Sequence, residues 1–319
     1  MSRWWIGIGL GLLLFGLSAN AAPWVIYETQ FEAPLFTNGY TLDGQDSWVA
    51  LPDTELHTSQ VVTDLLPGLG QNAILGFLAP DSNTVVSTSV FRPLNVDPVA
   101  QGKPLVVISV TMAIEDSTTT DRDTFRWVVY NRQNGGERLV AVEFDNGTTE
   151  IFFLTDDGTF HPTQTTFLNG HLYDLVLLLN LASNVWSATL NGELIVNAAP
   201  ITTQSRVLDL GDVDAAWVLG PDSTQFGDNY MIFDNFKVQA DVAVPLPCRV
   251  EPIDFLADGS FLLQLFGEPG RAYAVEASFD LVGWEPLGTN TPTGGSFVFL
   301  DSEAPDFPHS FYRGRAVWP

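Results

Sequence analysis

Residues 105–114 read LVVISVTMAI, and an apolar side chain occupies every second position from Val106 to Ile114. The positions in between include the polar residues Ser109 and Thr111. A period of two is typical of a β-strand that buries one face, because successive side chains point to opposite sides of a sheet. We therefore predict a strand here, with Ser109 and Thr111 on its outer face.

The same alternation recurs further along the chain. In FRWVVY at 125–130, Arg126 and Tyr130 share the face opposite to the larger apolar side chains. In VAVEFD at 140–145, Glu143 lies opposite to the apolar residues on either side of it. No stretch of ten or more residues outside the N-terminal segment shows a helical period.

Turn-forming residues separate these segments. Asn and Asp next to Gly tolerate the positive φ that tight hairpin turns require. The turn sequences are Asn134-Gly135-Gly136, Asp145-Asn146-Gly147, Asp156-Asp157-Gly158, Asn169-Gly170 and Asn191-Gly192. Short strands joined by tight turns, without helices between them, predict an all-β fold: a large antiparallel jelly-roll sandwich.

The first residues have the pattern of an export signal. Arg3 supplies a positive charge, the apolar stretch from Ile6 to Leu17 follows, and Ala19-Asn20-Ala21 places small residues where a signal peptidase cleaves. The apolar stretch is shorter than the roughly 20 residues of a membrane-spanning helix. We expect residues 1–21 to be a signal peptide, and the mature protein to be secreted, periplasmic or on the cell surface.

Proline content predicts a division of the remaining chain. Three prolines fall within residues 241–252, and proline removes a hydrogen-bond donor from a sheet. We interpret this stretch as a linker between a large domain at 22–240 and a small β-sandwich at 253–319. Cys248, the single cysteine, cannot form an internal disulfide.

The charge balance excludes some partners. The formal net charge is −25, with 13 Lys and Arg against 38 Asp and Glu, and the basic residues form no cluster in the sequence. Binding to a phosphate backbone needs clustered basic side chains, so nucleic acid is excluded as the expected partner. An anionic membrane surface is disfavoured for the same reason.

Three segments of the large domain carry a resemblance. They are Phe31-Glu32 with the following Leu42 to Trp48, the stretch from Gly170 to Gly192, and the closing Ile232 to Val238. Together they resemble the concanavalin-like jelly roll of laminin-G-type and related bacterial modules. The resemblance implies the fold, but not one function, because this fold includes lectins, hydrolases, lyases and structural modules.

The C-terminal segment carries a second resemblance. Gly270 to Ser278, Trp284, Phe297 to Asp301 and Phe311-Tyr312-Arg313 resemble a small β-domain at the C-termini of exported bacterial proteins. Such domains are similar to immunoglobulin or fibronectin type III sandwiches. The resemblance implies a modular exported protein.

The outward-facing residues form the candidate binding surface. If their strands are neighbours, they line one concave face that can combine polar groups with an apolar platform for a sugar. The candidate ligand-binding residues are Ser109, Thr111, Arg126, Tyr130 and Glu143. We expect Trp48 and Trp217 on loops at the rim of this face, and Trp127 and Trp186 in the core.

Catalytic patterns are incomplete. Glu143-Phe144-Asp145 begins the Glu-x-Asp-x-(x)-Glu pattern of jelly-roll glycoside hydrolases, but Gly147 and Thr148 stand where the second glutamate is required. We therefore predict no catalytic residues and no enzyme activity.

Calcium is the expected cofactor. In sandwiches of this type a glutamate near the start and an aspartate in the closing strand often hold calcium together with backbone carbonyls. Glu32 and Asp234 occupy those positions, and Asp234 interrupts an apolar alternation. A carboxylate on a buried face needs a partner or a metal.

These observations favour an exported, non-catalytic module that binds a glycan or cell-surface polymer, with structural calcium. One alternative is a structural or adhesive envelope protein without a small-ligand site. A second alternative is a polysaccharide-acting hydrolase or lyase.

Overall fold

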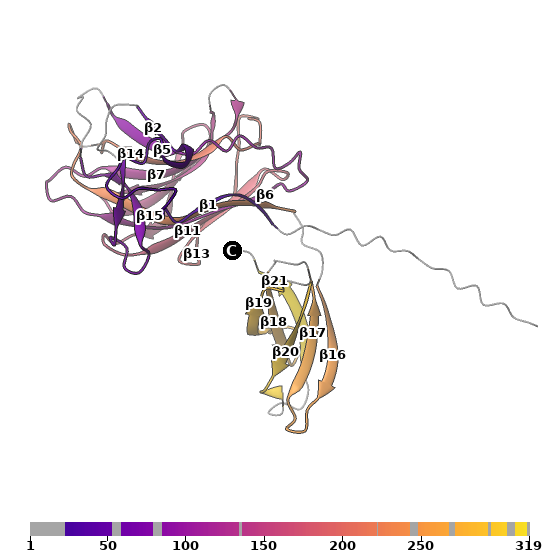
Figure 1. Ribbon diagram of the computed structural model, residues 1–319. Helices are drawn as coiled ribbons and strands as arrows, with labels where there is room; N and C mark the ends of the chain where they lie inside the picture. Colours follow the sequence, from indigo (N-terminus) through magenta and orange to yellow (C-terminus); the bar gives the residue numbers. More distant parts are fainter. Residues whose placement is uncertain are drawn as a thin grey trace, which may run out of the picture. The chain divides into compact units, whose positions relative to one another are not determined.

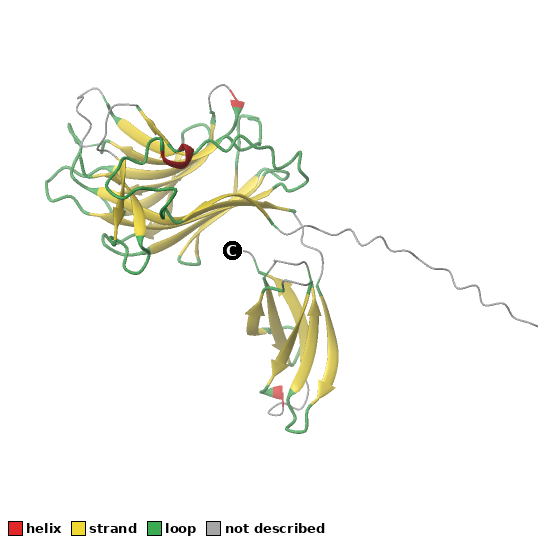
Figure 2. Cartoon of the chain, in the orientation of Figure 1, coloured by secondary structure: helices red, strands yellow, loops and turns green. Residues whose placement is uncertain are grey.

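A computed structural model describes residues 23–52, 59–78, 85–133, 136–221, 223–242, 248–267, 272–292, 295–304 and 310–317. The expected signal peptide at 1–21 lies outside the described residues. The chain forms two compact units, Pro23–Leu246 and Pro247–Arg315. Strands and loops make up nearly all of both units (Figure 2). In the described ranges, no helix has the length and apolar character to cross a membrane.

The large unit consists of two antiparallel sheets packed as layers, with β6 and β15 in one and β7 and β14 in the other (Figure 1). The eight-stranded sheet has the order β13-β12-β11-β6-β15-β4-β3, and β1 also pairs with β15. Its strands are β1 (Trp24–Thr29), β3 (Ser59–Thr63), β4 (Gln71–Gly76), β6 (Leu105–Glu115), β11 (Tyr173–Asn180), β12 (Val185–Leu190), β13 (Glu193–Pro200) and β15 (Tyr230–Asp241).

The seven-stranded sheet has the order β10-β9-β8-β7-β14-β5-β2. Its strands are β2 (Val49–Leu51), β5 (Ser87–Phe91), β7 (Thr124–Tyr130), β8 (Arg138–Asp145), β9 (Glu150–Leu154), β10 (Phe160–Thr166) and β14 (Asp212–Val218). The prediction of an all-β, antiparallel jelly-roll sandwich is confirmed.

The core lies between the inner faces of these two sheets. Alternate residues of β6 from Val106 to Ile114 are buried in it, as the period of two predicted. Trp127 and Trp186 are also fully buried in this core, as expected. The polar residues that alternate with these buried residues along the strands therefore face away from the core, on the two outer faces of the sandwich.

The expectation for Trp48 and Trp217 is wrong. Both are fully buried in the core rather than exposed at a rim. Each indole N–H has a buried acceptor: Trp48 Nε1 donates to the Tyr27 hydroxyl at 3.0 Å, and Trp217 Nε1 donates to Asp123 Oδ2 at 3.0 Å. A buried indole is stable where its single donor is satisfied, so neither tryptophan is accessible to a ligand.

The hairpin turns follow the predicted chemistry. Leu190 pairs with Glu193 across a two-residue turn, and its central residues Asn191 and Gly192 have φ values of 50° and 82°. Two successive positive φ values define the turn that matches the right-handed twist of the flanking strands.

The small unit is built from six strands in the described residues, arranged as two three-stranded sheets with the orders β16-β17-β20 and β19-β18-β21. The strands are β16 (Arg249–Phe255), β17 (Phe261–Phe266), β18 (Tyr273–Ser278), β19 (Glu285–Asn290), β20 (Ser296–Asp301) and β21 (Phe311–Ala316). The predicted linker, residues 241–252, is too long, because β15 includes Asp241 and β16 begins at Arg249. Pro252 is tolerated there because β16 is an edge strand with a register shift beside that residue.

Candidate functional site

The five predicted ligand-binding residues do not form one surface. Ser109 and Thr111 lie on β6 of the eight-stranded sheet, whereas Arg126, Tyr130 and Glu143 lie on β7 and β8 of the seven-stranded sheet. Because the chain crosses from one sheet to the other after β6, the outer faces of these strands point in opposite directions. The expectation of a single concave surface is therefore wrong, and the two groups form separate candidate sites.

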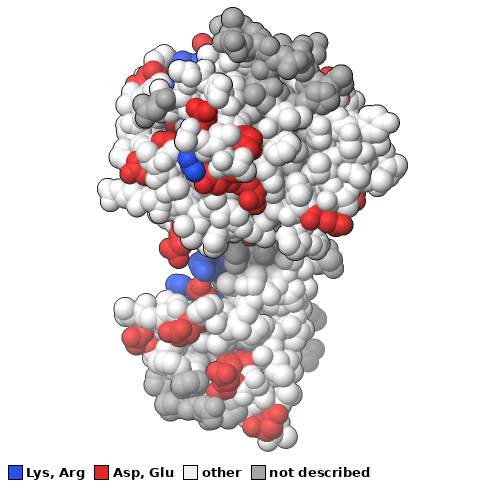
Figure 3. All heavy atoms as spheres, turned by 90° about the vertical axis from the view of Figure 1, so that its left-hand side faces the viewer, with Lys and Arg blue, Asp and Glu red and all other residues white. Residues whose placement is uncertain are grey.

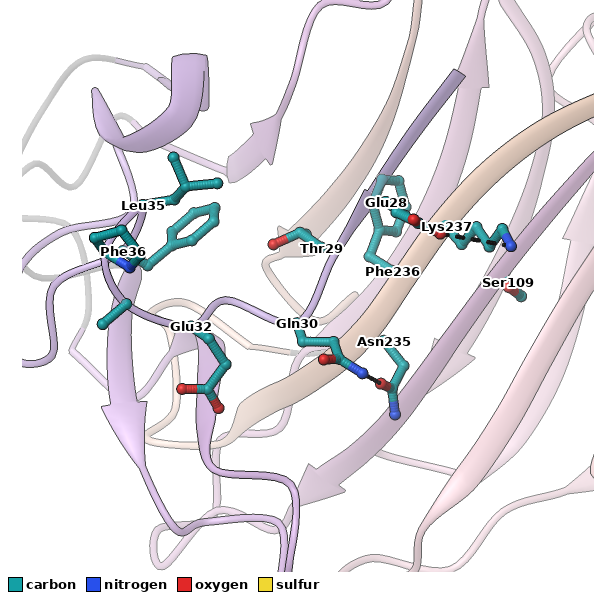
Figure 4. A pocket seen from close by; sticks show the side chains of 12 residues that line it. Glu28, Thr29, Gln30, Glu32, Leu35, Phe36, Ser109, Asn235, Phe236 and Lys237 are labelled. Carbon is teal, nitrogen blue, oxygen red and sulfur yellow. Dashed lines mark hydrogen bonds and ion pairs between the residues drawn. The ribbon is translucent and has the colours of Figure 1, made fainter. Parts of the chain in front are cut away.

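The first candidate is a cavity of about 550 Å³ beside β1 and β15 (Figure 4). Its lining includes two of the predicted residues, Ser109 and Glu32. Its polar side chains largely satisfy one another. Lys237 Nζ lies 3.5 Å from Glu28 Oε2, and Gln30 Nε2 donates to Asn235 Oδ1 at 3.2 Å.

The Thr111 hydroxyl already forms hydrogen bonds with side chains on both neighbouring strands, β11 and β15. It donates to Asp174 Oδ1 at 2.8 Å and accepts a 3.4 Å hydrogen bond from Asn235 Nδ2. The side chain is buried. Thr111 therefore has little remaining capacity to bind a ligand.

Glu32 and Asp234 are near each other, but both carboxylates already bind N–H groups. Glu32 Oε1 accepts from the Gln71 backbone at 2.8 Å, and Asp234 accepts from the Asn235 backbone at 2.6 Å and from Asn72 Nδ2 at 3.2 Å. Burial, together with the negative charge of Glu32, raises the pKa of Asp234 to about 6.

Calcium requires six to eight oxygen ligands. No group of three or more metal-binding side chains occurs in the described residues, so the acidic pair alone supplies too few ligands. Backbone carbonyls would have to supply the remaining ligands, and calcium at Glu32 and Asp234 stays a prediction.

The second candidate lies on the outer face of the seven-stranded sheet, where β8, β7 and β14 are adjacent. Arg126 and Glu143 are direct cross-strand neighbours, and Arg126 Nε donates to Glu143 Oε2. Burial raises the pKa of Glu143, although the charge of Arg126 opposes this shift. Beside this ion pair lie Phe160, which is half exposed and has the Arg126 guanidinium 5.8 Å from its ring centroid, and Phe152.

Tyr130 is the last residue of β7, which lies between β8 and β14. Its cross-strand neighbours are Arg138 on β8 and Asp212 on β14. Burial and the nearby Asp214 carboxylate raise the pKa of Tyr130. Its hydroxyl makes no hydrogen bond within the described residues and is therefore available to a ligand.

Asp212 and Asp214 are two positions apart on β14 and share its outer face. Asp214 is only 8% exposed, and its buried Oδ1 has no hydrogen-bond partner in the described part of the chain. Burial and the adjacent Asp212 carboxylate raise the pKa of Asp214 well above its usual range. Two like charges at this site cannot both ionise without penalty, so the pair retains one proton at neutral pH.

Arg138 is a site residue that the sequence analysis missed. Its Nη2 donates to the Thr155 carbonyl at 3.3 Å, and its buried Nε has no partner within the described residues. A register shift between Val129 and Tyr130 places Arg138, rather than Leu139, opposite Tyr130. The bulge interrupts the period of two, so alternation alone could not assign Arg138 to this face.

These six residues form what we call the Tyr130 cluster. Its members lie on three adjacent strands and share the outer face of the seven-stranded sheet. They are Arg126, Tyr130, Arg138, Glu143, Asp212 and Asp214.

The incomplete hydrolase pattern ends in a turn. Asp145 Oδ1 accepts from the Gly147 backbone at 2.8 Å, and Thr148 Oγ1 donates to Asp145 Oδ2 at 2.9 Å. Asp145 therefore stabilises the β8–β9 turn, and its carboxylate is not available beside Glu143 as a second reactive group.

Comparisons with known proteins assign no family. No family model and no curated protein matches the chain. Among solved structures, a carbohydrate esterase from the Shiga toxin-encoding bacteriophage phi24B is similar at 10% identity and a TM-score of 0.47, covering 69% of this chain and 100% of that one. Lectin II from Ulex europaeus is similar at 10% identity and a TM-score of 0.40, covering 64% and 96%.

A sialidase is also similar at 10% identity and a TM-score of 0.46, covering 69% of this chain but only 18% of the sialidase. At these identities and TM-scores the similarities assign neither a ligand nor an activity to this chain.

Proposed function

We propose that this chain is an exported, non-catalytic protein whose large unit binds a glycan or another cell-surface polymer through the Tyr130 cluster. The small unit serves as a spacer or attachment module. Secretion is tested by recovering the protein outside the cytoplasm with its N-terminus at Ala22.

The observation that supports this proposal is unused hydrogen-bonding capacity on a partly apolar face. Within the described residues the Tyr130 hydroxyl makes no hydrogen bond and Asp214 Oδ1 has no partner, while Phe152 and Phe160 lie on the same face beside the Arg126–Glu143 ion pair. Sugar recognition combines an apolar platform for the ring with a few convergent polar groups for the hydroxyls. Buried polar groups are normally satisfied, so an unsatisfied one beside an accessible aromatic surface is suited to a ligand.

The test is retention of the purified protein on an array of immobilised polysaccharides. Replacing Tyr130 by Phe removes one hydroxyl and keeps the ring, and the loss of one hydrogen bond weakens binding by about two- to tenfold. Tyr40→Phe is the matched control, because Tyr40 is 66% exposed and lies outside the cluster. Retention of no polysaccharide, or equal retention by both variants, would contradict binding at this face and favour the structural or adhesive alternative.

A polysaccharide-acting hydrolase or lyase is the second candidate. The specific observation in its favour is the acid pair Asp212 and Asp214 beside Tyr130, because adjacent carboxyls whose pKa values are raised by burial are suited to general acid and base roles. Release of reducing ends or unsaturated sugars that is abolished by Asp214→Asn, but not by Glu193→Gln at an exposed position, would establish catalysis.

A further inference from the structure

One arginine of the described residues differs from the others, because it forms no ion pair with a carboxylate. The chain has 38 acidic and 13 basic residues, so a carboxylate partner is easily found for each guanidinium. Every other arginine in the described ranges forms an ion pair with a carboxylate. Arg138 forms none within those ranges, and its buried Nε has no hydrogen-bond partner.

Arg138 forms one hydrogen bond to the backbone and lies near two other arginines. Its Nη2 donates to the Thr155 carbonyl at 3.3 Å. The Arg126 and Arg206 charges act on Arg138 and lower its pKa, but burial is the largest cause of that shift. Both of these arginines are paired, with Glu143 and with Asp156. Of these three arginines, only Arg138 forms no ion pair within the described residues.

In the part of the chain that the structure describes, the acidic residues near Arg138 form no ion pair with it. Asp156 also acts electrostatically on Arg138, but its carboxylate accepts four hydrogen bonds from Thr202, Thr203 and Gln204 and lies 3.4 Å from Arg206 Nε. Asp212 is separated from Arg138 by the intervening strand β7, because Tyr130 pairs with both. A guanidinium binds planar anionic groups well, and one that lacks an internal partner is suited to an external one.

We propose that the glycan bound at the Tyr130 cluster is anionic, with a carboxylate or sulfate ester that pairs with Arg138. The Tyr130 hydroxyl, on the neighbouring strand, donates to the same ligand, and Phe160 contacts the sugar ring. This inference rests on the proposed function, since it names the ligand class of the same site.

The test compares retention on immobilised polygalacturonate, dextran sulfate and neutral dextran at about 0.15 M salt, where the Debye length is about 8 Å. Under this condition, repulsion between the polymer and the distant carboxylates of the protein is screened. We expect retention on one of the two anionic polymers and none on dextran. Retention on polygalacturonate would identify the carboxylate as the recognised group, and retention on dextran sulfate would identify the sulfate ester.

Arg138→Gln should reduce that retention at least tenfold, since a charge-assisted hydrogen bond is lost. Arg138→Lys keeps the charge and should recover part of it. The matched control is Arg122→Gln, because Arg122 lies before β7 and is paired with Asp116. The thermal melt of each variant shows whether it is folded, and the comparison of polymers on the unmodified chain does not depend on any variant.

The outcomes separate the two proposals. Tyr130-dependent retention on neutral dextran would overturn the anionic ligand while binding at this face stands. Equal loss in the Arg138→Gln and Arg122→Gln variants would overturn the pairing of the ligand with Arg138. Retention on none of the polysaccharides would overturn both.

Discussion

Replacement of Asp214 by Asn is expected to stabilise the large unit at neutral pH. Asp214 is 8% exposed and lies on the same face as Asp212, so ionising both carboxyls in the folded state is costly. In the unfolded chain both carboxyls ionise with ordinary pKa values of about 3.9. The folded pair therefore holds a proton at pH 7 that the unfolded chain releases.

The magnitude follows from proton linkage. A carboxyl with a raised folded pKa makes the native state bind more protons than the unfolded state, so stability falls as pH rises. The free energy of unfolding decreases by about 1.4 kcal/mol per pH unit above the unfolded pKa, and this amounts to about 4 kcal/mol at pH 7. Replacement by Asn removes this pH-dependent loss of stability, but the amide NH₂ group needs acceptors. The net gain in the free energy of unfolding is therefore about 2–4 kcal/mol.

The assay is urea denaturation of the unmodified protein and the Asp214→Asn variant between pH 5 and 8. Tryptophan fluorescence follows the large unit, which buries four tryptophans completely: Trp48, Trp127, Trp186 and Trp217. The difference in unfolding free energy between variant and unmodified protein should grow with pH. Glu193→Gln, at an exposed position of β13, is the matched control and should show no such trend. A difference that is constant or shrinks with pH would refute the shared-proton interpretation.

Three further predictions concern the large unit. Arg126→Met leaves the buried Glu143 carboxylate unpaired and should cost about 3 kcal/mol in urea denaturation, with partial recovery in a double variant that also carries Glu143→Leu. Asp123→Ala should cost about 3 kcal/mol or more, because the buried carboxylate accepts hydrogen bonds from an indole, two backbone N–H groups and an amide. Calcium at Glu32 and Asp234 would raise the melting temperature, and a melt unchanged by a chelator would contradict it.

The sequence predicted the faces of strands well and the neighbours of strands poorly. Alternation assigned Trp127 to the core, and it assigned Arg126 and Tyr130 to an outer face. It contained no information about which sheet a strand joins, so Ser109 was grouped with residues that lie on the opposite side of the sandwich. Strand pairing in a jelly roll depends on contacts between residues far apart in the sequence, and a local period cannot report these.

The missed residues of the site had two different causes. Asp212 and Asp214 alternate with Val213, Ala215 and Trp217 in the sequence DVDAAWV, so the same period of two could have placed them on an outer face. Arg138 could not have been found in this way, because the bulge beside it shifts the register by one residue. The rim positions expected for two tryptophans failed because buried acceptors for their indole groups come from distant segments.

Hydrogen-bonding capacity distinguishes the two candidate sites better than cavity size does. The cavity beside β1 and β15 is large, but its opposing polar side chains are already paired with one another, as with Lys237 and Glu28. A ligand there must break these contacts before it gains its own, so its net binding energy is small. At the Tyr130 cluster, Arg138 forms no ion pair within the described residues, and its buried Nε has no hydrogen-bond partner there. An anionic ligand group that pairs with the Arg138 guanidinium breaks no existing ion pair of the described residues, so it loses less binding energy than a ligand in the larger cavity.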